Sequence, residues 1–342
     1  MMSFNSINKG VRKLLVCAGA TAIALSASMS VSAGDLRLKF AGTLPVDSQG
    51  TKMMKQIEKD IEAAGVGLEV LVFPANQLGS GEELFEDSIR GNVDMVAGFI
   101  YSHKDPVLEI ASLPFLVSSW QEMEDVMLDN GSAFNQIMSE RLEKLNLRLM
   151  NSIPVGFTGI VATEKPKDWA GMGDKGMNIR VWSSSLMKST VELMGYKATT
   201  MAWGDIFPAL QSGIVDGAIC CTKQDAYNIF AVSDVGKYYV ANDTISDTSF
   251  YYISKKTWDK LNEAQQKVVT QAFNRAAADF FAWNKANDSE FRTKLINKGY
   301  QVLEPTDAEK KTMKAKVRAE VWPQAENTIG KEVLDRLRAD NS

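Results

Sequence analysis

A single arginine, Arg180, stands inside a short apolar run that ends in three consecutive serines. Its neighbours Ile179 and Val181 follow the alternation of a β-strand, so we expect Arg180 on a strand. Residues Ser183–Ser185 are suited to cap a following helix, which would leave free helix N–H groups beside the arginine. A guanidinium next to such amides supplies fixed donors and positive potential, which is the chemistry that binds a carboxylate.

The local sequence also allows a structural role for this arginine. Arg180 could pair with a surface acid such as Glu192 or Asp174, an arrangement that is common and contributes little to stability. These residues alone leave the two interpretations about even.

Catalytic chemistry is poorly supported by the rest of the chain. The only histidine, His103, lies in a turn sequence, so no Ser-His-Asp arrangement and no metal-binding histidine pair is indicated. The segment Gly79–Gly81 lacks the lysine that a phosphate-binding loop needs. We therefore expect no enzyme activity, no metal and no cofactor.

Two cysteines beyond the N-terminal segment, Cys220 and Cys221, are adjacent. We favour two small buried thiols at the end of a strand, because a bond between neighbouring cysteines is strained and uncommon. An oxidising compartment would nevertheless permit such a bond, so both states stay open.

Three ordered blocks resemble the DctP-type substrate-binding proteins of TRAP (tripartite ATP-independent periplasmic) transporters. The first block is Gly176–Gly217, which contains the glycine, arginine, Met201-x-Trp203 and closing Asp-Gly features of that family's core pattern. Pro74–Met95 and Leu113–Val117 match two further blocks. The resemblance spans nearly the whole chain and implies that Arg180 clamps a ligand carboxylate.

The resemblance also places the other candidate ligand-binding residues. Thr158 stands where many members have a second arginine, and Cys220 stands where asparagine is frequent. Phe99 occupies a position that is acidic in some members that bind polyhydroxylated acids, and Trp203 is the aromatic residue of the core block. These departures predict a more apolar cleft around one anchor, and hence a small acid with few hydroxyls.

Four more positions complete the predicted ligand-binding set. Thr43 ends the first strand and Ser183 follows Arg180. Asp243 and Asp247 lie on a crossover, and they leave open a zwitterionic ligand whose cationic end meets an acid. A sulfonate could replace the carboxylate at Arg180.

The first 33 residues read as a signal peptide. Lys9, Arg12 and Lys13 precede the apolar core Leu14–Leu25, and small residues end at Ala33. Its removal leaves 35 basic and 42 acidic residues, a formal charge of −7. An acidic, exported chain has no electrostatic reason to bind nucleic acid or an anionic membrane. We expect a periplasmic protein without membrane insertion of the mature chain.

Strand and helix patterns alternate along the chain and predict an α/β fold with two lobes. The family implies a periplasmic-binding-protein architecture with a ligand cleft between the lobes and a long helix spanning both, which we place at Glu263–Lys298. We expect lobe I at 34–155 with part of 246–285, and lobe II at 156–245 with part of 286–342.

The implied function is capture of a small organic acid anion and its delivery to the membrane subunits of a TRAP transporter. Two alternatives remain at this stage: an ABC-type solute-binding protein, and a periplasmic sensing module for a signalling receptor. The sequence identifies neither the ligand nor the oligomeric state.

Overall fold

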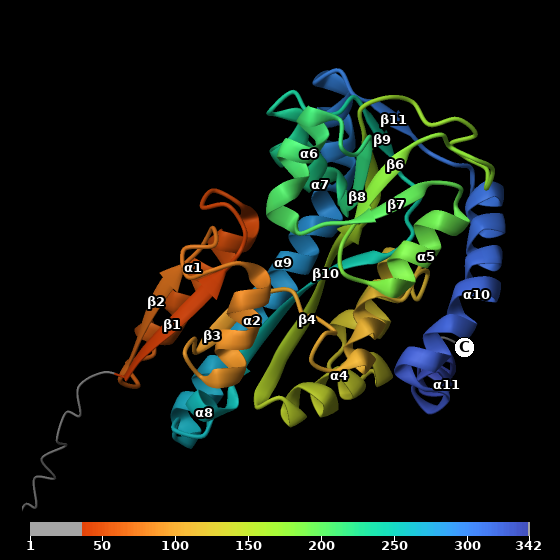
Figure 1. Cartoon of the computed structure of the whole chain (residues 1–342). Coiled ribbons are helices and arrows are strands. Elements are labelled where there is room, and N and C mark those ends of the chain that lie inside the picture. Colours follow the sequence, from red (N-terminus) through yellow and green to blue (C-terminus); the bar gives the residue numbers. More distant parts are fainter. Residues whose placement is uncertain (1–35, 341–342) are drawn as a thin grey trace, which may run out of the picture. The chain divides into compact units, whose positions relative to one another are not determined.

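Two β-sheets organise the computed structural model, which describes residues 36–340 (Figure 1). The predicted signal peptide lies outside these residues. No helix in the described range combines the length and apolarity needed to cross a membrane. The described residues group as one compact unit.

The first sheet has the strand order β2-β1-β3-β10-β4. β1 runs parallel to β2 and β3, whereas β10 runs antiparallel to β3 and β4. Its strands are β1 (Leu36–Gly42), β2 (Leu68–Phe73), β3 (Met95–Gly98), β4 (Leu147–Phe157) and β10 (Ser246–Ser254). The helices before, between and after these strands are α1 (Gln49–Ala63), α2 (Gly81–Arg90), α3 (Trp120–Met123), α4 (Ala133–Lys144) and α8 (Lys255–Trp258), with a 3-10 helix at Pro106–Ser112 and a π-helical turn at Glu124–Leu128.

The second sheet has the order β11-β9-β5-β8-β6-β7. β6 runs parallel to both β7 and β8, so their carboxyl ends meet at one edge of the sheet. Its strands are β5 (Gly159–Ala162), β6 (Asn178–Val181), β7 (Lys197–Thr200), β8 (Gly217–Cys221), β9 (Tyr238–Val240) and β11 (Gln301–Leu303). The connecting helices are α5 (Ser185–Leu193), α6 (Ile206–Ser212) and α7 (Lys223–Asp225), with a 3-10 turn at Trp203–Asp205 and a π-helical turn at Ala226–Ala231.

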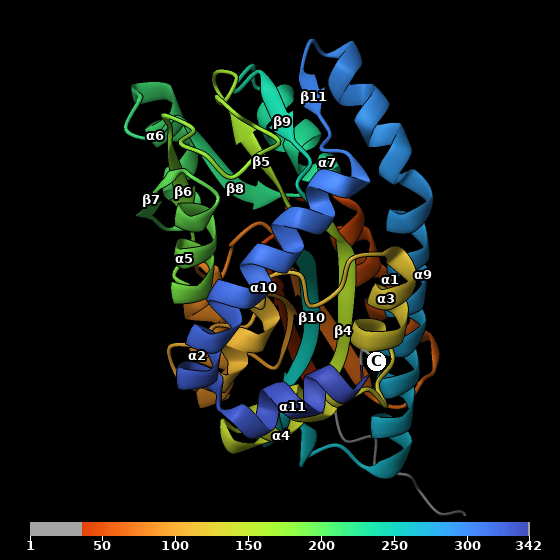
Figure 2. The ribbon, with the colours of Figure 1, turned by 90° about the vertical axis from the view of Figure 1, so that its right-hand side faces the viewer.

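The chain passes between the sheets at three places: through Thr158 after β4, through residues 241–245 before β10, and through α8 and the long helix that lead from β10 to β11. The long helix α9 (Glu263–Asn297) packs on α1 and β4 of the first sheet and on β11 of the second. Figure 2 shows α10 (Asp307–Ile329) and α11 (Lys331–Asp340) on the other side of the molecule, with α10 packed against α5 and the 106–112 helix. Two mixed sheets and a long shared helix confirm the predicted fold class; the lobe boundaries stay a prediction.

The core below the first sheet depends on an aromatic cluster that α9 completes. Phe273 has no exposed surface, and its ring lies 5.6 Å from Phe40 and 5.2 Å from Tyr251, centroid to centroid. Rings at such spacings and tilts add attraction beyond the apolar area that they bury. This cluster fixes the register of α9 against β1 and β10.

We predict that Phe273→Ala lowers the free energy of unfolding by about 3–5 kcal/mol, because it leaves a cavity among rings that cannot collapse. Urea unfolding followed by circular dichroism measures the change. Lys267→Ala, at an exposed position of the same helix, is the control and should change it by less than about 0.5 kcal/mol. Similar losses in both variants would contradict the packing described for Phe273.

Candidate functional site

Arg180 lies near the end of β6 and is only 3 % exposed. Its Nε donates to the Met201 carbonyl oxygen at 2.9 Å, which holds the guanidinium against the segment that follows β7. Neither Nη atom has a hydrogen-bond partner among residues 36–340, and no ion pair to Glu192 or Asp174 is present there. Both Nη groups are therefore available to an anion.

The charge of Arg180 is desolvated without being neutralised. Burial lowers the pKa of its guanidinium to about 10, while Glu82 and Tyr101 act in the opposite direction. The group is still protonated at neutral pH. A buried cation without a bonded counter-ion is costly, so an anion bound here would be strongly stabilised.

Trp203 supplies an exposed aromatic wall beside this charge. Its side chain is 44 % exposed, and the ring centroid lies 6.0 Å from Arg180 Cζ. Phe230 holds the indole from the other side in an edge-on contact of 6.4 Å. Arg180 and Trp203 were both predicted as ligand-binding residues, and their side chains are neighbours in the structure.

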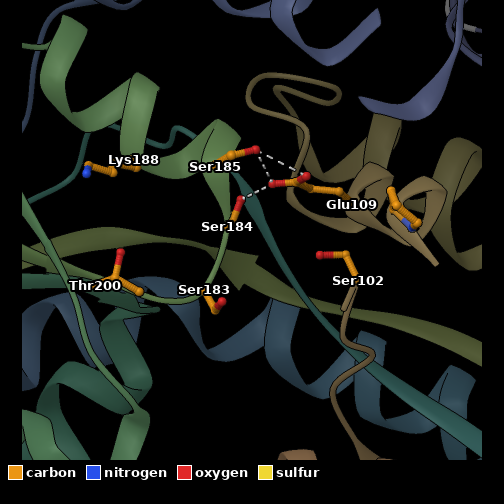
Figure 3. Close-up of a pocket in the computed structure, with 8 residues that line it drawn as sticks. Ser102, Glu109, Ser183, Ser184, Ser185, Lys188 and Thr200 are labelled. Carbon is orange, nitrogen blue, oxygen red and sulfur yellow. Dashed lines mark hydrogen bonds between the residues drawn. The ribbon is translucent and has the colours of Figure 1, made fainter. Parts of the chain in front are cut away.

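The helix that follows Arg180 does not offer the free N–H groups that we expected. The Glu109 carboxylate, from the 106–112 helix, accepts from Ser184 Oγ at 2.7 Å, from Ser185 Oγ at 3.2 Å and from Leu186 N at 3.2 Å (Figure 3). Ser184 Oγ in turn accepts from Met187 N. This expectation was wrong because the chain supplies its own anion to the start of α5.

Ser183 is exposed and lines a cavity of about 340 Å³ over the start of α5. Thr200, Ser102 and Lys188 line it as well, together with Glu109 and the two serines that Glu109 contacts (Figure 3). Arg180 does not line this cavity. Ser183 therefore follows Arg180 in sequence but faces a different space.

A second cavity, of about 360 Å³, lies between the two sheets, and we call it the central cavity. Three predicted residues line it: Thr43 after β1, Phe99 after β3, and Asp247 on β10. β10, the start and end of α7, the turn after α7, and α9 also contribute side chains to the lining. These are Ser249, Thr222, Asp225, Asn228, Phe280, Trp283, Asn284, Phe291 and Lys294. Its size suits a compact ligand.

The central cavity is more acidic than the sequence suggested. Asp225 and Asp247 both line it, and neither forms an ion pair among residues 36–340. Burial raises the pKa of Asp247 well above its usual range, and Asp225 raises it further. Burial also raises the pKa of Asp225, against a lowering by hydrogen bonds from Thr222. The prediction of an apolar cleft was wrong at this wall.

Cys220 and Cys221 are joined by a disulfide at the end of β8, so the interpretation as two thiols was also wrong. Cys220 is half-buried and Cys221 is fully buried. Thr158, the position of the family's second arginine, is buried, and its N–H donates to the Ile245 carbonyl oxygen. Neither Thr158 nor Cys220 lines the central cavity.

Asp243 is bound elsewhere. Its carboxylate pairs with the Lys310 ammonium of α10, and it lines neither cavity. His103 contacts Glu86 on the outside of α2. Within residues 36–340, no group of three or more His, Cys, Asp or Glu side chains is arranged to hold a metal ion.

Sequence reasoning missed Glu109, Asp225, Ser249 and Asn284. Two of them carried a readable signal. Thr222-x-x-Asp225 directly after a strand is a helix-start pattern, and Thr222 does cap α7. Glu109 is a lone acid in an otherwise apolar segment, which indicates a buried partner.

A family model described as bacterial extracellular solute-binding protein, family 7 (DctP), matches residues 40–327. The chain belongs to this family. It is thus a solute-binding protein of TRAP systems and not an enzyme, and its fold matches that function.

Individual relatives are distant but cover most of the chain. The sialic acid-binding periplasmic protein SiaP of Vibrio cholerae is 22% identical over 330 residues, 93% of this chain and 96% of SiaP. The C4-dicarboxylate-binding periplasmic protein DctP of Rhodobacter capsulatus is 25% identical over 257 residues, 71% of this chain and 72% of DctP. A solved TRAP periplasmic solute-binding protein of Desulfovibrio desulfuricans, with bound sn-glycerol-3-phosphate, superimposes with a TM-score of 0.80 at 23% identity, covering 90% of this chain and 98% of that one.

We predict that Cys220 and Cys221 resist alkylation in unfolded, unreduced protein and take up two labels after reduction. Peptide mapping by mass spectrometry locates the labels, and the reduced sample serves as the positive control. Labelling of either cysteine without reductant would show free thiols.

We predict that Glu109→Gln lowers the free energy of unfolding by about 1–3 kcal/mol, because an amide places N–H groups against donors that now face a carboxylate. Urea unfolding measures the loss. Glu192→Gln, at an exposed position of the same helix α5, is the matched control and should change stability by less than about 0.5 kcal/mol. An unchanged Glu109→Gln midpoint would remove Glu109 from the capping role.

Proposed function

We propose that this protein binds a small organic acid in the periplasm and presents it to the membrane subunits of a TRAP transporter. The observation that carries the proposal is Arg180, a buried guanidinium with both Nη groups unpaired, beside the exposed ring of Trp203. A planar guanidinium matches a carboxylate through two parallel hydrogen bonds. The family supplies the transport context.

Relatives support the class of ligand without fixing its identity. Their names or bound ligands include sialic acid, C4-dicarboxylates and sn-glycerol-3-phosphate, all of which carry an acidic group. Thr158 and Cys220 stand where the family often has an arginine and an asparagine, so these two positions offer fewer donors to ligand hydroxyls. We therefore infer a compact acid with few hydroxyls.

Closure of two lobes would make the presentation depend on ligand. We infer that each sheet forms the core of one lobe, with the chain crossing near residues 155 and 245 and with parts of the later chain returning to each lobe. Glu82 and Tyr101 belong to the first-sheet side and already act on Arg180 of the second. A carboxylate held by Arg180 would thus be enclosed as the sides approach, and only the closed form would dock productively on the permease.

A sensing role is the second candidate. A bound ligand would close the protein in the same way, and a receptor rather than a permease would read the closed form. The basic, apolar and small residues of 1–33 support export as a cleavable signal peptide, which both roles require. Deletion that abolishes uptake of the ligand would favour transport, and loss of a transcriptional response alone would favour sensing.

We predict that a small carboxylate found by thermal-shift screening binds Arg180→Lys at least about tenfold more weakly than wild type, because an ammonium cannot make the two-pronged contact. Isothermal titration calorimetry of both proteins measures the ratio. Arg275→Lys, at an exposed pair with Asp60, is the matched control and should bind as wild type does. Equal affinity in wild type and Arg180→Lys would exclude Arg180 as the anchor.

A further inference from the structure

Two aspartates meet at the inner wall of the central cavity without a cation between them. Asp247 lies on β10 of the first sheet, and Asp225 ends α7 beside the second. Asp225 Oδ2 accepts from Thr222 Oγ1 at 2.9 Å, and its other oxygen has no partner within residues 36–340. The Asp247 carboxylate has no hydrogen-bond partner within the same residues. The two carboxylates therefore have unused acceptor capacity toward the cavity.

The lysines that line this cavity do not neutralise them. Lys294 pairs with Glu290 at 2.7 Å, one turn away on α9. Lys52 is exposed near the equally exposed Asp47. Within residues 36–340, no lysine or arginine is thus paired with Asp225 or Asp247.

Two buried polar side chains add acceptors at the same wall. Ser249 lines the cavity, is 7 % exposed, and its hydroxyl has no partner among the described residues. Asn284 is 4 % exposed; its Nδ2 donates to the Phe280 carbonyl oxygen at 2.8 Å, while its Oδ1 is unpaired. Polar groups this deeply buried normally have partners, so unpaired ones in a cavity indicate a ligand.

Aromatic rings close the remaining sides. Phe99 lines the cavity from the first sheet, and Phe280 and Trp283 line it from α9. An aromatic face attracts a cation, and it also excludes the water that would screen the two aspartates. Acceptors plus aromatic faces are the surroundings that select an organic cation.

The cavity and Arg180 lie at the same edge of the second sheet. Arg180 is opposite Ala218 in the parallel pair β6–β8, and Thr222, which lines the central cavity, follows directly after the end of β8. Arg180 itself lines neither of the two cavities. On the first sheet, Thr43 lines the cavity, and a Cβ placed on Gly81 would touch both Thr43 and Tyr101, the tyrosine that acts on Arg180. Tyr101 and Thr43 thus connect the surroundings of Arg180 with the lining of the central cavity.

We propose that the ligand is a zwitterion, whose carboxylate binds Arg180 and whose cationic nitrogen group binds between Asp225 and Asp247. This inference rests on the proposed function for its anionic end. A simple dicarboxylate would place its second charge against two acids and is disfavoured by the same geometry.

Proton release gives this pair a signature that a packing role would not produce. The raised pKa of Asp247 favours its protonated form in the empty cavity, and a cation favours the ionised form. Of the nearby groups, Tyr239 stays neutral because burial raises its pKa, and Lys223 is paired with Asp288. Because Asp225 also raises the pKa of Asp247, cation binding should release protons and tighten as pH rises.

The test uses three acids that differ only at one end: 4-aminobutyrate, 4-hydroxybutyrate and pentanoate. A second pair, glycine betaine and 3,3-dimethylbutyrate, compares a quaternary ammonium with its neutral isostere. Calorimetry is run on wild type, Asp247→Asn and Arg180→Lys, with Asp47→Asn at the exposed mouth as the control. Titrations in phosphate and in Tris buffer report the protons released.

We expect at least one zwitterion to bind wild type tenfold or more tightly than its uncharged counterparts, and Asp247→Asn to remove that preference and the proton release. Asp47→Asn should retain both. The inference is overturned if pentanoate or 4-hydroxybutyrate binds as tightly as 4-aminobutyrate and 3,3-dimethylbutyrate as tightly as glycine betaine, or if neither zwitterion binds at 10 mM. If the acids without a cationic group bind to wild type and bind more weakly to Arg180→Lys, only the zwitterion inference fails, and the proposed function stands. If zwitterions bind equally to wild type and Arg180→Lys, the anion anchor fails instead.

Discussion

The buried, unneutralised charge of Arg180 is the constraint on which the site depends. A guanidinium that is 3 % exposed loses most of its hydration, yet within residues 36–340 only its Nε has a hydrogen-bond partner. The fold must therefore hold β6 firmly enough to keep that charge in place, and the pairing of β6 with both β7 and β8 does so. In the function that we propose, the partner of this charge is an anion that arrives from outside the chain.

Glu109 shows what the chain does where no ligand is required. The start of α5 would otherwise present N–H groups and the positive end of the helix next to Arg180, a second attraction for anions. Glu109 occupies it with three hydrogen-bonded contacts and is itself buried. Because Glu109 fills this competing site with a protein carboxylate, the start of α5 would not compete with Arg180 for the anion that we propose.

The sequence predicted those features that depend on local pattern. Apolar periodicity placed α9 within one residue of its observed end, and alternation placed Arg180 on a strand. The family motif, rather than the pattern, singled out Arg180 and Trp203 from other arginines and aromatics. Asp225 and Asn284 could not be predicted as cavity residues, because only tertiary contacts bring them to the cavity. Asp225 ends a three-residue helix, and Asn284 lies within a 35-residue helix. Similarly, nothing in the sequence was a reason to treat Asp243 and Asp247 differently. In the structure Asp243 pairs with Lys310, whereas Asp247 lines the central cavity.

Opposite charges at the two ends of one region restrict ligands more than either alone. An anion anchor without the aspartates would accept any small acid of suitable size, because the remaining contacts are apolar and weakly selective. Acidic groups at the far wall repel a second carboxylate and leave a neutral tail facing unpaired oxygens of Ser249 and Asn284. The three charged groups come from both sheets. Asp247 lies on the first sheet, Arg180 lies on the second, and Asp225 lies in α7 beside the second. A ligand that satisfies all three must contact both sides at once, so selectivity and closure follow from the same placement of charge.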